Sequence, residues 1–137
     1  VSTPLFRRVI EVNLFGTYNV MTYAAQAMMD LPPLETGERG VIINTASAAY
    51  EDGQVGQAAY AASKGAIASM CLPAAREFAK TGIRVVATVD AIVENIPFPH
   101  RLGQPSEYAH LAADIVRNAY LNGTVIRLDG AVRLPPR

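Results

Sequence analysis

The sequence predicts an α/β protein with a parallel sheet, and three segments carry this prediction. Residues 40–47 (GVIINTAS) and 82–89 (GIRVVATV) contain short apolar runs rich in β-branched residues. Such runs are typical of strands covered on both faces. A long helical pattern, residues 56–80, lies between them. A strand, a long helix and a second strand favour a βαβ crossover, and 137 residues suit a single domain.

The chain begins with a second long helical pattern, over residues 3–30. Thr3 can cap this helix, and Pro4 suits its first position. Leu5 and Val9 then follow at helical spacing. The stretch LPPLETGERG contains two prolines and two glycines, so a loop is expected to connect the helix to the first strand.

The remaining elements are marked by glycine and proline. The helix over 56–80 should end before Gly82, since glycine commonly follows a helix, and Pro73 should bend it locally. After the second strand we expect an irregular segment over residues 90–104 and a helix beginning at a proline over 105–120. A turn and a final strand should follow over 122–130.

Composition excludes several classes of protein. Half of the residues are apolar and twelve basic residues balance twelve acidic ones, so we expect neither a nucleic-acid nor a membrane partner. The single cysteine, Cys71, excludes an internal disulfide and is expected to be a buried, inert thiol. His100 and His110 lack partners at ligand spacing, so no metal site is expected. Ten arginines against two lysines favour a cytoplasmic bacterial protein over a mitochondrial one.

The stretch QAAYAASKGA places Tyr60 and Lys64 four residues apart in a run of good helix formers. Positions i and i+4 are neighbours on one helix face, so a phenol and an ammonium stand side by side. A neighbouring cation favours a phenolate, which can then act as a general base. An exposed pair without chemistry is the alternative interpretation.

A serine precedes this pair at the end of the first predicted strand. Ser47 lies thirteen residues before Tyr60. Ligands of open α/β sheets bind beyond the carboxyl ends of the strands, so we expect the two hydroxyls to meet in one pocket there. Taken alone, Ser47 would be read as an ordinary loop serine.

The combination of these residues resembles the short-chain dehydrogenase/reductase superfamily. Its Ser…Tyr-x-x-x-Lys hallmark matches Ser47, Tyr60 and Lys64, and its helical asparagine matches Asn13 in EVNLFGTYNV. Without the resemblance, Asn13 would be read as a solvated helix position. The resemblance implies a Rossmann-like doubly wound parallel sheet, of which this chain would be the catalytic C-terminal half.

The resemblance also implies roles for these four catalytic residues in hydride transfer with NAD. Tyr60 would be the acid or base, and Lys64 would assist it and bind the nicotinamide ribose together with Tyr60. Ser47 and Tyr60 would bind the substrate oxygen. Asn13 would hold a water molecule that connects Lys64 to solvent.

Three further strings, QVGQAAY, PFPHRLG and VIRLDGAVR, resemble the branch of the superfamily that oxidises 3-hydroxyacyl-CoA thioesters in fatty acid metabolism. This resemblance implies that Gln54 binds the thioester carbonyl, with a solvated loop amide as an equal alternative. Other substrates, such as a steroid or a 3-oxoacyl carrier-protein thioester, remain open. A non-catalytic scaffold is the alternative from another class of function.

Two parts of the family pattern have no counterpart in these residues. The glycine-rich turn that holds the pyrophosphate is missing, and so is the Pro-Gly turn with its substrate loop after the second strand. We therefore expect residues 1–137 to be one incomplete domain, with a missing segment between Val89 and Asp90. The resemblance further implies a homotetramer formed through 3–30, 56–80 and the C-terminal strand region.

Overall fold

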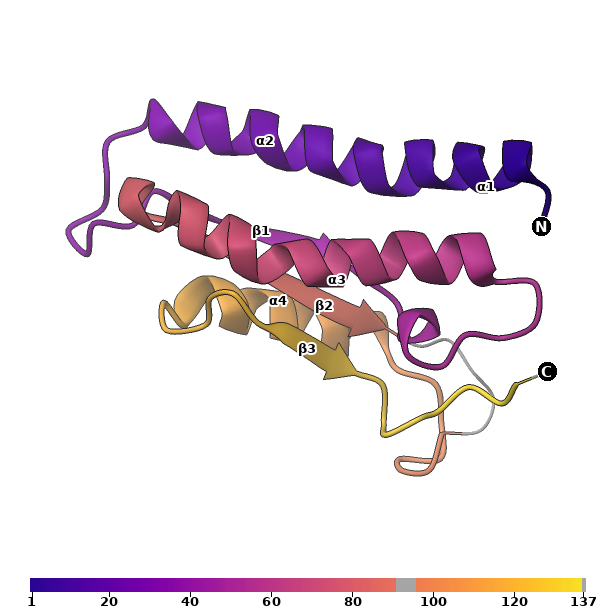
Figure 1. Cartoon of the computed structure of the whole chain (residues 1–137). Coiled ribbons are helices and arrows are strands. Elements are labelled where there is room, and N and C mark those ends of the chain that lie inside the picture. The colour runs from indigo at the N-terminus through magenta and orange to yellow at the C-terminus, as the bar shows by residue number, and fades with distance from the viewer. Residues whose placement is uncertain (91–95, 137) are drawn as a thin grey trace.

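The computed structural model describes residues 1–90 and 96–136, and it has the predicted α/β architecture (Figure 1). Its α-helices are α1 (Thr3–Val9), α2 (Gly16–Met29), α3 (Ala58–Phe78) and α4 (Pro105–Arg117). Its strands are β1 (Gly40–Thr45), β2 (Ile83–Asp90) and β3 (Val125–Leu128). Three shorter helical segments are the π-helical η1 (Ile10–Phe15) and the 3-10 helices η2 (Ala48–Tyr50) and η3 (Ala79–Thr81).

The sheet has the order β1-β2-β3, and both pairs of strands are parallel. The helices α1, α2 and α3 lie on one face of this sheet, and α4 lies on the other (Figure 1). All three strands therefore end at the same edge, where η2, the start of α3 and the C-terminal segment also lie. This is the edge at which open α/β sheets bind their ligands.

The central strand β2 confirms the prediction of a strand covered on both faces. Its residues 83–89 are all buried. One face packs on the α2–α3 core through Ile83, Val85 and Ala87. A fully buried Ile115 on α4 belongs to the opposite layer. Burial on both faces leaves no room for the alternation of polar residues that marks a half-exposed strand.

Arg84 is the exception in this apolar strand, and it fixes the end of α4. Its guanidinium pairs with Glu38 at 2.8 Å. It also donates to backbone carbonyls at the C-terminal end of α4 and just beyond, those of Ile115, Val116, Asn118 and Leu121. The last carbonyls of a helix lack partners inside the helix, and a cation there also suits the helix dipole. The helix ends at Arg117, three residues earlier than predicted.

The helix after β1 ends as the sequence predicts. After α3 and η3, Gly82 adopts a left-handed conformation with φ of +73°. A Cβ atom at this position would lie 2.2 Å from the carbonyl oxygen of Gly37, so only glycine fits. Pro73 lies inside α3, which continues through it to Phe78. The bend expected there stays a prediction.

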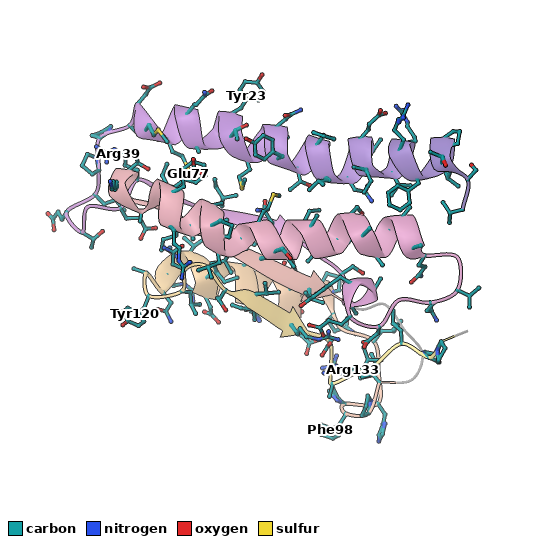
Figure 2. The ribbon with its side chains drawn as sticks, viewed as in Figure 1. Tyr23, Arg39, Glu77, Phe98, Tyr120 and Arg133 are labelled. Atoms are coloured by element: carbon teal, nitrogen blue, oxygen red, sulfur yellow. The ribbon has the colours of Figure 1, made fainter. Side chains whose placement is uncertain are left out.

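The long N-terminal helix is confirmed, but it changes geometry in the middle. Residues 3–29 are helical throughout, with η1 forming a π-helical stretch between α1 and α2. Along its outer side the helix carries exposed apolar residues, among them Val12, Phe15, Val20 and Tyr23. Tyr23 points away from the sheet (Figure 2). Within residues 1–90 and 96–136, no helix is long and apolar enough to cross a bilayer.

At the expected gap, β2 continues from Val89 to Asp90, and these residues are in register with Arg127 and Leu128 of β3. The two residues are thus consecutive positions of one strand. Residues 91–95, which belong to the segment expected to be irregular, lie outside the described residues. The missing segment stays a prediction.

Candidate active site

Ser47 stands where β1 ends and the chain turns into η2. It is the N-cap of η2, and its Oγ atom accepts a hydrogen bond from the backbone N–H of Ala49 at 3.3 Å. The first strand therefore ends at Thr45, two residues earlier than predicted, because Ser47 begins the next element. A hydroxyl that accepts in this way keeps its own hydrogen for donation. Half-buried Ser47 can thus donate to a ligand at the carboxyl end of the sheet.

Tyr60 lies in the first turn of α3, which begins at the same edge of the sheet. Its side chain is 39% exposed, so a molecule at this edge can reach the phenol. The strand, loop and helix between 40 and 64 therefore bring Ser47 and Tyr60 to one end of the molecule, as the spacing predicts.

Lys64 lies one turn further along α3 and reaches back to the sheet. Its Nζ atom donates to the carbonyl oxygen of Thr45, the last residue of β1, at 2.8 Å. The same atom lies 5.8 Å from the centroid of the Tyr60 ring, within the range of a cation–π contact. An ammonium has three N–H groups, so two remain for a ligand. Lys64 is therefore bound to the sheet, while a chemical role for the Tyr60–Lys64 pair stays a prediction.

Asn13 lies in the π-helical segment η1 and faces α3. Its Nδ2 amide donates to Oγ of Ser63 at 3.1 Å, and that hydroxyl donates to the carbonyl oxygen of Tyr60 at 2.7 Å. Single π-helical turns often occur at functional sites. Asn13 is therefore not a merely solvated helix position, since its amide is bonded to the helix that bears Tyr60 and Lys64. Its water-holding role stays a prediction.

Gln54 lies between Ser47 and Tyr60, in the loop before α3. Its Nε2 amide donates to the carbonyl oxygen of Pro135 at 3.1 Å. Its Oε1 atom accepts from the amide of Gln57 at 3.3 Å. The loop amide is thus held by the C-terminal segment, and its contact with a substrate stays a prediction.

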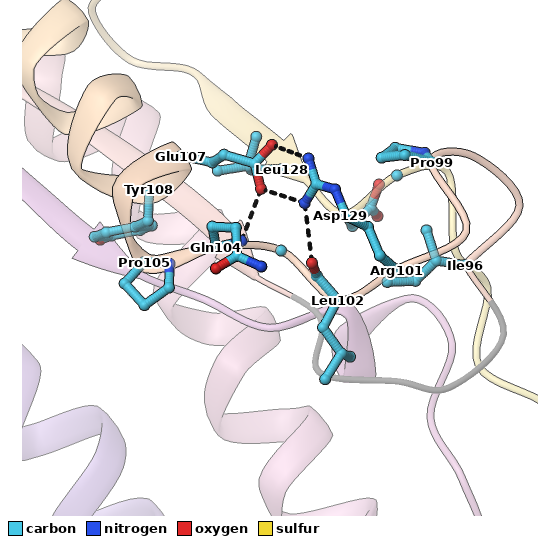
Figure 3. Close-up of a pocket in the computed structure, with 12 residues that line it drawn as sticks. Ile96, Pro99, Arg101, Leu102, Gln104, Pro105, Glu107, Tyr108, Leu128 and Asp129 are labelled. Carbon is cyan, nitrogen blue, oxygen red and sulfur yellow. Dashed lines mark hydrogen bonds and ion pairs between the residues drawn. The ribbon is translucent and has the colours of Figure 1, made fainter.

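A cavity of about 520 Å³ lies at the N-terminal end of α4, beside the end of β3 (Figure 3). Arg101 and Glu107 form an ion pair at its wall, and Glu107 also accepts from the backbone N–H of Gln104. Ser47 and Tyr60 are not among the residues that line this cavity. The pocket expected between their two hydroxyls therefore stays a prediction.

Other reactive groups take no part in this arrangement. Cys71 is buried in the core between α3 and β2, as predicted, and burial raises the pKa of its thiol. The described ranges, 1–90 and 96–136, contain no group of three or more His, Cys, Asp or Glu residues that could hold a metal ion.

Two residues with contacts near the candidate site, Ser63 and Arg127, were not predicted from the sequence. Ser63 is a fully buried residue of α3 that faces η1. It stands among small residues in the sequence, so nothing marks it as different from them. Arg127 forms ion pairs with Glu51 and Asp52, which precede it by about 75 residues. Ser63 lies three residues after Tyr60, on the side of α3 that meets η1.

Comparison with known proteins shows similarity along almost all of the chain. The model of the short chain dehydrogenase family matches residues 1–97. The chain is 53% identical to mouse and 49% identical to human 3-hydroxyacyl-CoA dehydrogenase type-2, across 96% of this chain and 57% of each relative. The crystal structure of 3-hydroxyacyl-CoA dehydrogenase type-2 from Mycobacterium avium matches with a TM-score of 0.96 at 40% identity, covering all of this chain and 60% of that one.

The chain therefore spans less than two thirds of the length of these relatives. The alignment with the mouse protein covers 148 positions against 137 residues here, so at least 11 positions have no counterpart in this chain. This difference agrees with a missing internal segment without placing it.

Proposed function

Because the chain belongs to the short-chain dehydrogenase/reductase family, we propose that the full-length protein is an oxidoreductase that transfers a hydride between NAD and a 3-hydroxyacyl-CoA. The observation that carries this proposal is the placement of Lys64, which lies 5.8 Å from the ring of Tyr60 and is bound to Thr45, two residues before Ser47. The similarity to 3-hydroxyacyl-CoA dehydrogenases over 96% of the chain supports the choice of substrate.

The residues present fit the nicotinamide end of the cofactor. Tyr60 offers an exposed phenol, and Lys64 offers two N–H groups that its bond to Thr45 leaves over. Both groups can bind ribose hydroxyls. NAD, when bound, accepts or supplies the hydride, and the protein positions the substrate and moves the proton.

Proton transfer falls to Tyr60 in this proposal. In alcohol oxidation its phenolate takes the proton of the substrate hydroxyl, and in ketone reduction its phenol returns one. The ammonium of Lys64 favours the phenolate through its positive charge. The hydroxyl of Ser47 donates to the substrate oxygen and stabilises the charge that develops there. Asn13 holds a water molecule that connects Lys64 to solvent.

Gln54 would donate to the thioester carbonyl of the substrate. Its amide then exchanges the carbonyl of Pro135 for that of the ligand. The proposed full-length protein is a homotetramer, since the exposed apolar side of α1, η1 and α2 offers a surface for a second copy. Its proposed location is the bacterial cytoplasm, which rests on the ten arginines against two lysines.

An assay of the purified full-length protein tests the proposed function. We expect acetoacetyl-CoA to be reduced faster with NADH than with NADPH. With NADH, we expect acetoacetyl-CoA to be reduced faster than a steroid ketone or a 3-oxoacyl carrier-protein thioester. Preference for one of the other ketones would move the protein to another branch of the family. No turnover with any of them, in a folded protein that binds NADH, would favour a scaffold.

A further inference from the structure

Arg127 joins three separate parts of the chain at the carboxyl end of the sheet. Its guanidinium, on β3, pairs with Asp129 at 2.6 Å and with Asp52 at 3.4 Å, and it also pairs with Glu51. It further donates to the carbonyl oxygen of Val132 at 3.3 Å. The side chains of Arg127, Asp52 and Asp129 are 18%, 14% and 6% exposed, so their two ion pairs are largely shielded from solvent. Glu51, at 42%, is more exposed. Partly buried pairs are screened by salt less than exposed ones.

The charges around Arg127 favour the guanidinium. Burial by itself would lower the pKa of Arg127, but the hydrogen bond and charge of Asp129 and the charges of Glu51 and Asp52 outweigh it and raise that pKa. Removal of the guanidinium would leave three carboxylates without their common cation, with Arg133, 3.6 Å from Asp129, as the remaining positive charge. Such an arrangement is destabilising because like charges repel.

The C-terminal segment, residues 132–136, rests on the same loop that Arg127 holds. The backbone N–H of Val55 donates to the carbonyl oxygen of Pro136 at 3.2 Å, and the amide of Gln54 donates to that of Pro135. The segment runs beside this loop at the carboxyl edge of the sheet (Figure 1). We call residues 51–57 the acidic loop, since it begins with Glu51 and Asp52.

The C-terminal segment also contacts the surroundings of Ser47. Leu134 packs against the small cluster formed by Ala46, Ala48 and Val89. Ala46 and Ala48 flank Ser47 in the sequence, so the segment packs beside the stretch of backbone that carries the hydroxyl proposed to bind substrate. The acidic loop and the C-terminal segment thus form a single wall beside Ser47, with Arg127 at their junction.

We infer that Arg127 is a positioning residue: its ion pairs hold the acidic loop and the C-terminal segment together as one wall of the substrate site, and this wall sets the affinity for the acyl part of the substrate. The inference rests on the proposed function for the identity of the ligand. The wall carries two apolar side chains suited to an acyl chain, Val55, which is 84% exposed, and the partly buried Leu134.

Hydrogen–deuterium exchange of the full-length protein tests the coupling without reference to activity. In Arg127→Gln we expect the amides of 51–57 and of 132–134 to exchange faster together, since Pro135 and Pro136 carry no N–H. Arg127→Lys, which keeps the charge, should restore part of the protection. The matched control is Arg117→Gln. Arg117 forms a single ion pair, with Asp114 at 2.8 Å, and both side chains are exposed on the surface of α4. This variant should leave exchange in both segments unchanged.

Leu134→Ala is a second variant that leaves every ion pair in place. It should speed exchange in the acidic loop although no residue of that loop has changed. If Arg127→Gln fails to fold, this variant decides the coupling. Exchange that rises in only one of the two segments, in either variant, would overturn the inference.

Kinetics with acetoacetyl-CoA separate positioning from general structural damage. Loss of binding that is equal in the ground and transition states raises KM and leaves kcat unchanged. We expect KM in Arg127→Gln to rise about tenfold with kcat within about twofold, and Arg117→Gln to match the wild type. A fall in kcat at unchanged KM would contradict the inference. If the wild type does not turn over acetoacetyl-CoA, the proposed substrate is refuted. If exchange in the acidic loop and the C-terminal segment still rises together in Arg127→Gln, the positioning role of Arg127 stands.

Discussion

At the scale of single residues, the candidate site depends on the length and reach of Lys64. The side chain crosses from α3 to the last residue of β1, where its ammonium donates to the carbonyl oxygen of Thr45. This bond fixes the cation near the Tyr60 ring and ties helix to sheet. The bond holds Lys64 at the carboxyl end of β1, where the proposed site lies.

Lys64→Ala should change the pH dependence of catalysis and weaken cofactor binding. Without the neighbouring cation the phenolate is less favoured, so alcohol oxidation should begin at higher pH than in the wild type. The Kd for NADH should rise about tenfold or more, because hydrogen bonds to a charged group are lost. A pH–rate profile and a fluorescence titration of the full-length variant measure both effects. An unchanged profile would remove Lys64 from the mechanism.

Asn13 and Ser63 should act as one unit, since a single hydrogen bond joins them and Ser63 continues to the carbonyl of Tyr60. Residues in contact give coupling energies of about 0.5–3 kcal/mol in a double-mutant cycle. We expect Asn13→Ala and Ser63→Ala to be coupled in kcat/KM, with the double variant less impaired than the sum of the two. Additive effects would place the function of Asn13 elsewhere.

At the scale of elements, α4 begins with a cap built from three polar side chains. Gln104 and Glu107 form a capping box, and Arg101 pairs with Glu107 at 2.7 Å. The hydrogen bond from Arg101 and that from the backbone of Gln104 lower the pKa of Glu107 from 4.5 to about 2. The cap thus holds its charge under all but strongly acidic conditions.

The effect of this cap on stability has a definite sign. A depressed pKa in the folded state means that the contribution of Glu107 is complete above its ordinary value and is lost as pH falls through about 2. Exposure of the pair keeps that contribution small. A carboxyl titration followed by NMR in the full-length protein should give a midpoint near 2 for Glu107. A midpoint at its ordinary value would contradict the cap.

Elements with a local cause were predictable from the sequence. The β2 run is apolar on both faces because helices cover both sides, and Gly82 is required by a left-handed turn. The Tyr60–Lys64 pair could be found because both residues lie on one helix. The π-helical turn at Asn13 had no such signal.

Long-range contacts explain what the sequence could not predict. Arg84 sits in a strand of apolar type, and its partners lie 31 to 46 residues away in the chain. The partners of Arg127 on the acidic loop lie 75 and 76 residues away. The charges of neighbouring residues in the sequence do not indicate ion pairs between residues so far apart. These partners come together only when the sheet is assembled.

At the scale of the whole molecule, the outer side of α1, η1 and α2 exposes apolar residues that a soluble monomer would usually cover. Tyr23, which points away from the sheet and is 71% exposed, lies on this side (Figure 2). The homotetramer proposed for the full-length protein would bury this surface.

Tyr23→Arg should therefore weaken the tetramer, because it would place a charge in an apolar contact. Light scattering coupled to size exclusion should give a tetrameric mass for the wild type and a smaller mass for the variant. Leu34→Arg is the control, since Leu34 is exposed in the loop after α2. A monomeric wild type, or equal effects of the two changes, would contradict the assignment of this surface.

The central claim is that this protein is a dehydrogenase in which Tyr60 transfers the proton. Its most direct test compares the turnover of acetoacetyl-CoA with NADH by the full-length wild type and by Tyr60→Phe. The change removes only a hydroxyl from an exposed side chain, so the protein should still fold. NADH binding should weaken through the lost ribose contact but persist through Lys64, so kcat is measured at saturating NADH. We predict a fall in kcat of about 10²–10⁴, the range attributed to general acid–base catalysis. A variant that turns over within a few-fold of an active wild type would contradict the claim.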